Sequence, residues 1–288
     1  MSQLQAIKER REAVRSTQKI TTAMKMIAVS RLRAAQRIKQ QADAYVSHIE
    51  RLFQVVVAQS SQAFGRYTQS PDVQKDLYII VAANRGLCGS YNQNIFRMTT
   101  MILEQNQGTE SSLDVITLGK KGGEFIGRCE DVDHIAHYPL GDTPDYSQIE
   151  GVIQHVLPAI TAGTYRKVIC LGTRYRSALL QEAQAIQIFP YEYAEAIGVL
   201  REISVDPDLQ TGADHLWGFY LRSKLYECIL QSVTSEHAAR MRAMDGASRN
   251  ATEMIEELTL RYNRQRQSTI TSELIEIIAG SESMKGEN

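Results

Sequence analysis

Two glycine-containing turns are the first places in this sequence where residue types and spacing favour ligand chemistry. Residues 86–89 read Gly-Leu-Cys-Gly and lie between a short apolar run and a helical pattern, where a dinucleotide-binding fold holds a pyrophosphate. They lack the third glycine of that motif and a matching acidic residue on a second strand. Residues 119–123 read Gly-Lys-Lys-Gly-Gly, which is not the spacing of a phosphate-binding P-loop. We therefore interpret residues 86–89 as a tight strand-to-helix turn, with nucleotide binding as the alternative.

Histidine, aspartate and cysteine side chains can supply metal ligands, general bases and nucleophiles, and several occur in the middle of the chain. His134, His137, Asp142 and Asp145 lie near one another in sequence, but their spacing matches no metal site, so we interpret them as a polar loop. Cys88 has no candidate base nearby in sequence, which favours a small buried thiol over a nucleophile. The sequence therefore predicts no catalytic residue, no cofactor and no metal.

Composition and charge limit the class of protein. The 288 residues are 43% hydrophobic and 23% charged, which fits a soluble chain of one or two domains. The net charge of -1 provides no global attraction to nucleic acid or to an acidic membrane. No run approaches the roughly 18 apolar residues of a membrane span, and the amino terminus does not read as a secretory signal. Because the cysteines are scattered, we expect a reducing compartment and an intracellular protein that reaches a membrane only through a partner.

The first 60 residues are predicted to form one long helix, because no glycine or proline occurs before Gly65. A seven-residue repeat of apolar or small side chains indicates a helix wound around a partner helix, about 80 Å long at 1.5 Å per residue. Residues 8–39 hold ten Lys or Arg against two Glu, so a nucleic-acid contact is an alternative, but residues 1–44 have no aromatic side chain. The predicted stripe is Ile7, Val14, Thr21, Ala28, Ala35, Ala42, Ile49 and Val56.

Residues 208–288 are predicted to form a second long helix. Pro207 is the last proline, and Gly246 is the only glycine from Phe219 to Ala279. Side chains spaced by three and four again describe a coiled-coil seam. Two long helices at the ends of one chain can bury their stripes most simply against each other, as an antiparallel coiled coil. The second predicted seam is Met241, Met244, Ser248, Ala251, Ile255, Leu258 and Tyr262.

Residues 72–205 are predicted to form a separate, small α/β domain of the Rossmann-like, doubly wound type. Short runs rich in β-forming residues alternate with helical patterns and glycine turns, which predicts a mostly parallel sheet. Pro190 argues that the last strand lies at an edge of the sheet. The predicted strands are 76–83, 113–118, 133–138, 166–171 and 184–193, and the predicted helices are 94–103 and 146–160.

Four stretches closely resemble the gamma subunit of F-type ATP synthases, and they occur in the same order along the whole chain. The terminal stretches are STQKITTAMKMIA at 16–28, EHAARMRAM at 236–244 and YNRQRQSTITSELIEIIAG at 262–280. The middle stretch is RGLCG at 85–89, where the family usually has a second glycine after Cys-Gly and this chain has Ser90 and Tyr91. The absence of the insertion found in chloroplast relatives makes the resemblance one to the bacterial type.

The resemblance implies a function in ATP synthesis and ion transport. In such proteins the terminal helices form a rotor shaft inside a ring of alpha and beta subunits, and the α/β domain faces the epsilon subunit and the membrane c-ring. The shaft transmits torque between the c-ring and the catalytic ring and carries no catalytic site. The expected location is the cytoplasmic side of the bacterial plasma membrane, as a peripheral subunit. The alternative function is an α/β nucleotide-binding enzyme with helical oligomerisation arms.

The resemblance also implies contact residues for the beta subunit. Met24 matches the position where the first helix passes a lever loop of that subunit, with Arg240 close by on the other helix. Arg266 and Gln267 match residues that hydrogen-bond to a catch loop, and the adjoining part of the shaft tip holds two further polar residues, Thr271 and Glu273.

Overall fold

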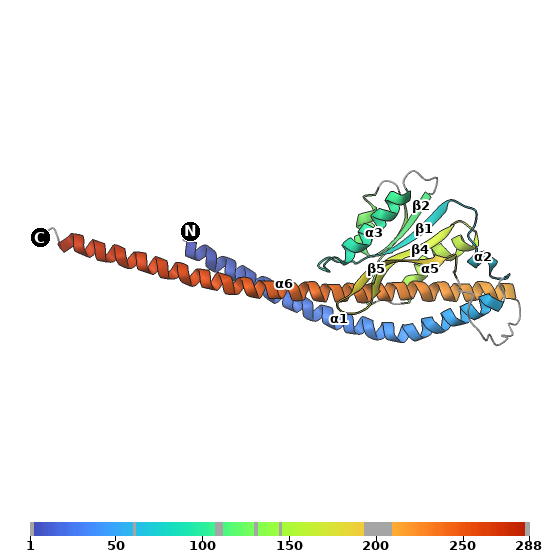
Figure 1. Ribbon diagram of the computed structural model, residues 1–288, viewed down its shortest axis with the longest axis horizontal. Helices are drawn as coiled ribbons and strands as arrows, with labels where there is room; N and C mark the ends of the chain where they lie inside the picture. Colours follow the sequence, from blue (N-terminus) through green and yellow to red (C-terminus); the bar gives the residue numbers. More distant parts are fainter. Residues whose placement is uncertain are drawn as a thin grey trace. The chain divides into compact units, whose positions relative to one another are not determined.

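The computed structural model describes residues 3–59, 62–106, 112–129, 132–143, 146–192 and 209–285, and it divides into two compact units. The sheet unit comprises residues 28–242, and the paired-helix unit comprises residues 1–27 and 243–288. Helix α1 (Gln3–Gln59) and helix α6 (Leu209–Lys285) each contribute to both units (Figure 1). The prediction divided the chain at changes of composition, at 60, 72 and 208, whereas the structure divides inside the two long helices.

The sheet unit contains five strands in the order β3-β2-β1-β4-β5. Strands β1 to β4 run parallel, and β5 pairs with β4 in the antiparallel direction at one edge. An edge position for the last strand agrees with the expectation from Pro190, which follows the strand directly. The strands are β1 (Lys75–Val81), β2 (Ser112–Leu118), β3 (Asp133–Tyr138), β4 (Lys167–Tyr175) and β5 (Gln181–Phe189).

Helices cover both faces of this sheet, which confirms the doubly wound fold. Helices α3 and α4 pack on one face, and α5 with parts of α1 and α6 packs on the other. Side chains of strand β1 alternate between the two faces, as the pleat of a strand requires. Leu77 and Ile79 pack with α5, α1 and α6, whereas Tyr78 and Ile80 pack with α3 and α4. The short helices are α2 (Gly65–Thr68), α3 (Tyr91–Asn106), α4 (Lys120–Ile126) and α5 (Ser147–Thr161).

An aromatic cluster joins the carboxyl-terminal part of α1 to the first turns of α6 within the sheet unit. Phe53 of α1 stacks on Tyr220 of α6 with ring centroids 4.6 Å apart, and Tyr67 stacks on Trp217 at 4.8 Å. Trp217 and Phe53 are fully buried. Aromatic side chains bury large areas, so this cluster fixes both helices to the sheet unit.

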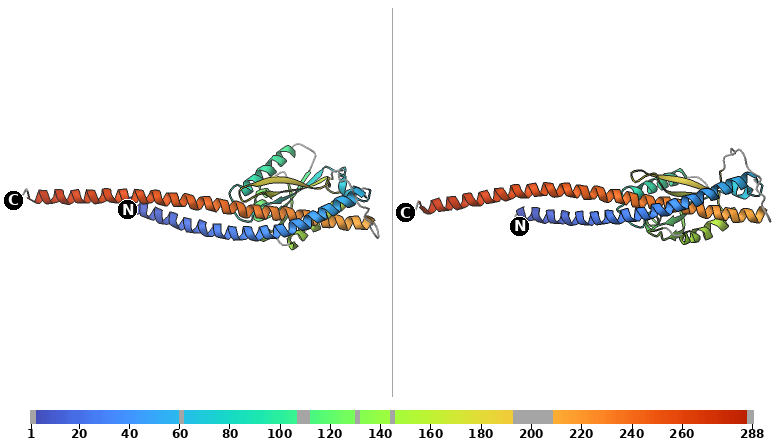
Figure 2. Two further views of the ribbon diagram at one scale, coloured as in Figure 1. Left: turned by 60° about the horizontal axis from the view of Figure 1, so that its bottom comes forward. Right: turned by 90° about the horizontal axis from the view of Figure 1, so that it is seen from below.

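The paired-helix unit is an antiparallel pair of helices, and the views in Figure 2 agree that they run side by side. Thr21 is buried in the seam, as are Met244, Ala251 and Leu258 of α6. Polar contacts cross the pair in antiparallel order. They are Gln18 Nε2 to Thr252 Oγ1 at 2.7 Å, Thr22 Oγ1 to Ser248 Oγ at 2.9 Å, Lys25 Nζ to Asp245 Oδ1 at 2.6 Å, and the Arg11 guanidinium over the Tyr262 ring at 5.1 Å.

Every member of the predicted stripe on α1 is buried or half-buried. Thr21 belongs to the paired-helix unit, whereas Ala28, Ala35 and Val56 are buried within the sheet unit. The seven-residue repeat therefore identifies the inward face of α1 along its length. It does not distinguish burial against one helix from burial against a domain, because both require the same apolar spacing.

Candidate partner-contact surface

The last described turns of α6 present four of the predicted contact residues to solvent. Arg266, Gln267, Thr271 and Glu273 are exposed, and the Thr271 hydroxyl donates a hydrogen bond to the Gln267 carbonyl at 2.8 Å within the helix. Every residue from 271 to 279 is exposed. Figures 1 and 2 show why: α6 continues past the first residues of α1, so this part of the helix has no neighbouring helix in the described chain.

Apolar side chains at the same end of α6 were missed by the sequence reasoning. Leu274 is 53% exposed, and four isoleucines around it are similarly exposed. Ile270, Leu274 and Ile277 share one helix face, because residues spaced by three and four align along a helix. An exposed apolar face of this kind marks an interaction surface. The signal was present in the sequence, but its spacing resembles a continuation of the coiled-coil seam. The exposed isoleucines are Ile270, Ile275, Ile277 and Ile278.

Met24 lies on α1 in the paired-helix unit and is half-buried. Its neighbours differ: Met26 is 62% exposed, and Ile27 is also exposed. A half-buried position on the helix pair leaves part of the thioether side chain available to a partner. The structure thus presents two methionines on the same helix with different surroundings.

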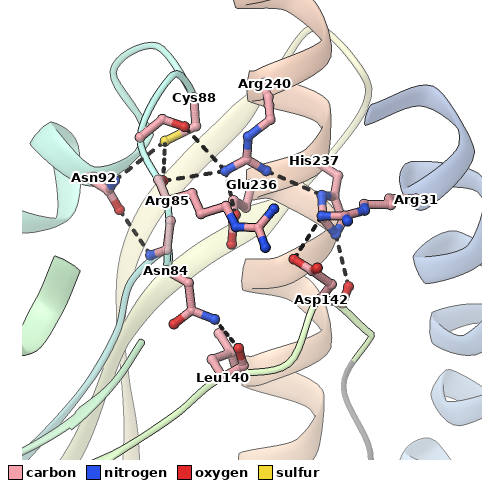
Figure 3. Close-up of polar contacts among 12 residues, drawn as sticks. Arg31, Asn84, Arg85, Cys88, Asn92, Leu140, Asp142, Glu236, His237 and Arg240 are labelled. Atoms are coloured by element: carbon pink, nitrogen blue, oxygen red, sulfur yellow. Dashed lines mark hydrogen bonds and ion pairs between the residues drawn. The ribbon is translucent and has the colours of Figure 1, made fainter. Parts of the chain in front are cut away.

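Arg240 is in a different environment from the other five predicted residues, because it belongs to the sheet unit and is only 8% exposed. Its Nη2 donates to Glu236 Oε1 at 2.6 Å, to the Arg85 carbonyl at 3.4 Å and to the Gly86 carbonyl at 3.5 Å (Figure 3). Its Nη1 lies 3.4 Å from His237 Nδ1. The guanidinium is therefore bound within the chain itself, and its predicted contact with a beta subunit stays a prediction.

His237 continues this polar network to α1. Its Nε2 lies 3.0 Å from the Asp142 carbonyl, and the Asp142 carboxylate forms an ion pair with Arg31 of α1 at 2.8 Å. Burial lowers the pKa of His237 below its ordinary value, so the neutral imidazole is the favoured form. Nδ1 can then accept from Arg240 while Nε2–H donates to Asp142.

The polar side chains of α6 occupy the place where a doubly wound fold binds a ligand. That place is the crevice at the carboxyl ends of neighbouring strands where the strand order reverses, here β1 and β4. Ser232 Oγ accepts from the Thr173 amide at 3.0 Å, and Ser235 Oγ donates to the Thr173 carbonyl at 3.2 Å. A Cβ on Gly172 would lie 2.6 Å from Ser232 Oγ. Because the helix approaches so closely, α6 fills this crevice.

The turn at residues 86–89 connects β1 to α3, as predicted. Gly89 has a φ of +58°, which favours glycine, but Leu87 adopts φ +61° without being glycine. A Cβ on Gly86 would meet no atom within 4 Å, so Gly86 is not required there by steric contact. Cys88 is buried, which confirms the prediction of a buried thiol, and burial raises the pKa of that thiol.

The histidines of the predicted polar loop lie on strand β3 instead. His134 Nε2 and His137 Nδ1 each lie 2.9 Å from the Thr117 hydroxyl, so a threonine occupies the space between the two rings. Asp142 lies in a loop as predicted, and Asp145 lies outside the described residues. Within the ranges that the structure describes, no three His, Cys, Asp or Glu side chains are grouped closely enough to hold a metal ion.

None of the helices in the described part of the chain combines the length and the apolar character needed to cross a membrane.

Comparison with known proteins places this arrangement in a family. The family model described as ATP synthase matches residues 3–284. A protein of Geobacter metallireducens named ATP synthase gamma chain is 35% identical over 99% of this chain and 100% of its own length. A protein of the same name from Xanthomonas oryzae pv. oryzae is 34% identical over 96% of this chain and 97% of its own length.

Solved structures give the same fold at lower identity. A chain in the central stalk and c-ring structure of Tetrahymena thermophila mitochondrial ATP synthase aligns with a TM-score of 0.62 at 20% identity, covering 80% of this chain and 99% of its own. A chain from Euglena gracilis mitochondrial ATP synthase aligns with a TM-score of 0.54 at 18% identity, covering 88% and 94%.

Proposed function

This chain belongs to the family of ATP synthase gamma chains and is a rotor-shaft subunit of such an enzyme, and from that premise we propose how each unit transmits torque. The paired-helix unit turns inside a ring of alpha and beta subunits. The sheet unit contacts the membrane c-ring and the epsilon subunit. The chain thereby couples ion translocation to ATP synthesis or hydrolysis in a membrane-associated complex, as a peripheral subunit on the cytoplasmic side of a bacterial plasma membrane.

The exposed end of α6 is the observation that supports this proposal most directly. Residues 271–279 are all exposed, yet they include Leu274 and Ile277, whose apolar surface is stabilised when a partner covers it. A sleeve of surrounding subunits would cover it on all sides. A single flat partner would cover only one face of the helix.

Torque passes by differential contact. The shaft surface is uneven, so each angle of rotation favours one conformation of the facing beta subunit. A contact changes an equilibrium only by the difference between its free energies in the two states. Rotation therefore changes the populations of conformations at the catalytic sites, and ATP hydrolysis at those sites turns the shaft in the reverse direction.

The chain itself performs no bond chemistry and needs no cofactor. Two observations support this: α6 side chains fill the crevice between β1 and β4, and the Cys88 thiol is buried with a raised pKa. An enzyme built on residues 72–200 would bind nucleotide in a saturable way. We expect no such binding by the isolated chain, measured by calorimetric titration with ATP and NAD.

Met24, Arg266, Gln267, Thr271 and Glu273 are the proposed contacts with the beta subunit. Met24 would pass a lever loop, Arg266 and Gln267 would donate hydrogen bonds to a catch loop, and the last two would adjoin that loop. The exposure of the four α6 residues supports this assignment. Arg240 has the weakest support, because its guanidinium is already bound within the chain.

Met24→Lys tests the proposed contact. A new cation at this position changes the contact free energy unequally at different shaft angles, so coupling weakens while the helix pair stays folded. We expect fewer ions pumped per ATP hydrolysed in membrane vesicles containing the assembled complex. Met26→Lys is the matched control, because it adds the same charge at an exposed methionine two residues away. An unchanged ratio for Met24→Lys, or an equal loss for Met26→Lys, would show that Met24 is not the contact.

A further inference from the structure

The paired-helix unit buries little apolar surface between its two helices. Among the described residues of this unit, Thr21 is the only buried side chain on α1, and Met244, Ala251 and Leu258 are the only ones on α6. Thr21 and Ala251 are small, so their burial removes little apolar area from water. The other seam positions in this unit are half-buried. The hydrophobic effect therefore holds this pair of helices together only weakly.

The polar contacts between these helices lie at the surface of the pair. Both interhelical hydrogen bonds are exposed. The side chains of the ion pair between Lys25 and Asp245 are 36% and 34% exposed. Because water competes for the same groups, exposed hydrogen bonds and ion pairs add little to stability. The two hydrogen bonds join Gln18 to Thr252 and Thr22 to Ser248.

An open groove lies between the helices near the amino terminus of α1. Its volume is about 550 Å³, and its lining includes Ala6 and Ile7 of α1 and Leu258 of α6. Packed protein interiors contain few voids larger than one water molecule. A groove of this size means that the side chains of the two helices do not interlock there. The first turns of α1 are therefore the least firmly held part of the pair.

The sheet unit holds other parts of the same two helices by much larger burial. Ala28, Leu32 and Ala35 of α1 are buried there, and so is every residue from 228 to 240 of α6. The free energy of local opening follows local burial, so it varies along one chain. Each long helix thus passes from a firmly held stretch into a weakly held one.

We propose that the paired-helix unit opens separately from the sheet unit in the isolated chain, with residues 3–24 of α1 leaving α6, and that the ring of alpha and beta subunits closes it on assembly. Once released, residues 3–24 are a short helix without a partner, and such helices are marginal in water. The ring supplies the burial that the pair lacks, including the surface of Ile20, which is 57% exposed. The closing step rests on the proposed function, whereas the opening step does not.

Hydrogen exchange of the isolated full-length chain tests the opening step. Amides of residues 7–20 should exchange at least about tenfold faster than amides of residues 228–240, because their opening costs less free energy. Residues 30–57 belong to the same helix α1 but to the sheet unit, so they should stay protected. A smaller difference between residues 7–20 and 228–240 would overturn the proposal. Equally fast exchange at residues 30–57 would also overturn it, because α1 would then open as a whole.

A seam-filling variant tests the cause of the opening. Gln18→Leu combined with Thr252→Leu replaces a polar contact across the pair with an apolar one. Exchange of residues 7–20 should slow at least about fivefold, because the new contact buries apolar area. The matched control is Ser16→Leu combined with Asn250→Leu, at two exposed positions. Equal slowing in both double variants would contradict the proposal, because it would come from helix propensity and not from packing between the helices.

Exchange in the assembled complex tests the closing step. Residues 7–20 should exchange at least about tenfold more slowly in the complex than in the isolated chain, because the ring covers the pair. Equal rates in both would overturn the closing step.

The proposed function and this inference fail in different ways. If vesicles assembled with the unaltered chain hydrolyse ATP without pumping ions, the shaft function is wrong. If those vesicles pump normally but residues 7–20 are as protected as residues 228–240 in the isolated chain, only the separate opening is wrong.

Discussion

Two stretches of the same helix α6 have opposite surroundings. Every residue from Cys228 to Arg240 is buried, although seven of them are Ser, Thr, Glu, His, Arg or Gln types. Every residue from 271 to 279 is exposed, although Leu274 and three isoleucines lie among them. Burial along this helix therefore follows its neighbours more than its own hydrophobicity. The polar stretch is satisfied by strand ends and turns, whereas the apolar stretch exposes side chains that a partner can cover.

The largest test of this comparison truncates a buried leucine and an exposed one. Leu230→Ala should lower the free energy of unfolding by about 2–5 kcal/mol, because Leu230 is 1% exposed and its loss leaves a cavity. Leu274→Ala, the same change on the exposed stretch, should alter it by less than about 0.5 kcal/mol. Urea denaturation of the full chain measures both. Equal effects would contradict the contrast.

The next test concerns the close approach of α6 to β4. Gly172→Ala should destabilise the sheet unit by about 1–3 kcal/mol, because the new methyl would lie 2.6 Å from Ser232 Oγ. Adding Ser232→Ala removes that oxygen, so the double variant should lose less stability than the sum of the two single variants. Denaturation of all four chains provides the cycle, and strictly additive losses would show that the two residues do not meet.

A pH test examines the buried polar stretch through His237. Its pKa is lowered from 6.5 mainly by burial, with Arg240 and Arg31 lowering it and Glu236 and the Asp142 carbonyl raising it. Between the lowered pKa and 6.5 the unfolded chain binds more protons than the folded chain, so stability rises with pH in that window. The stability that comes from a neutral His237 in the folded chain is fully present above about pH 6.5 and is lost as the pH falls. His237→Gln should flatten this slope in thermal unfolding measured at several pH values; an identical slope would exclude His237 as its source.

The smallest effect on the stability of the isolated chain is expected for a substitution in the exposed stretch, residues 271–279. The same substitution should weaken the assembled complex. Leu274→Ser should leave the unfolding of the isolated chain within about 0.5 kcal/mol of the original. In the assembled complex we expect weaker retention of the shaft, because a covered apolar side chain is lost. Subunit dissociation measured by mass photometry would test this. Glu253→Gln, at an exposed position nearer the middle of α6, is the control that should retain the shaft normally.

The amino-acid sequence contained enough information for most of the fold. Strands 113–118 and 133–138 were placed within one residue of the observed ends, because buried parallel strands appear as short apolar runs between turns. The edge position of the last strand followed from Pro190. The strand itself begins at Gln181, earlier than predicted, since its mixed polar residues give no clear start.

The site was less predictable than the fold. Resemblance provided six contact residues, and the structure exposes Arg266, Gln267, Thr271 and Glu273 but buries Arg240. The ion pair with Glu236 has the spacing of an ordinary surface pair on a helix, four residues apart. Only the position of the β1–α3 turn against the helix shows that this pair is internal.

The sequence by itself determined the two long helices and their inward faces, because helix formation and amphipathic spacing are local properties that repeat along the chain. The tertiary structure decided which polar residues of α6 are buried and which apolar residues are left outside. That outcome depends on segments distant in sequence, such as residues 85–88 and 172–173, whose approach to the helix is set by the sheet.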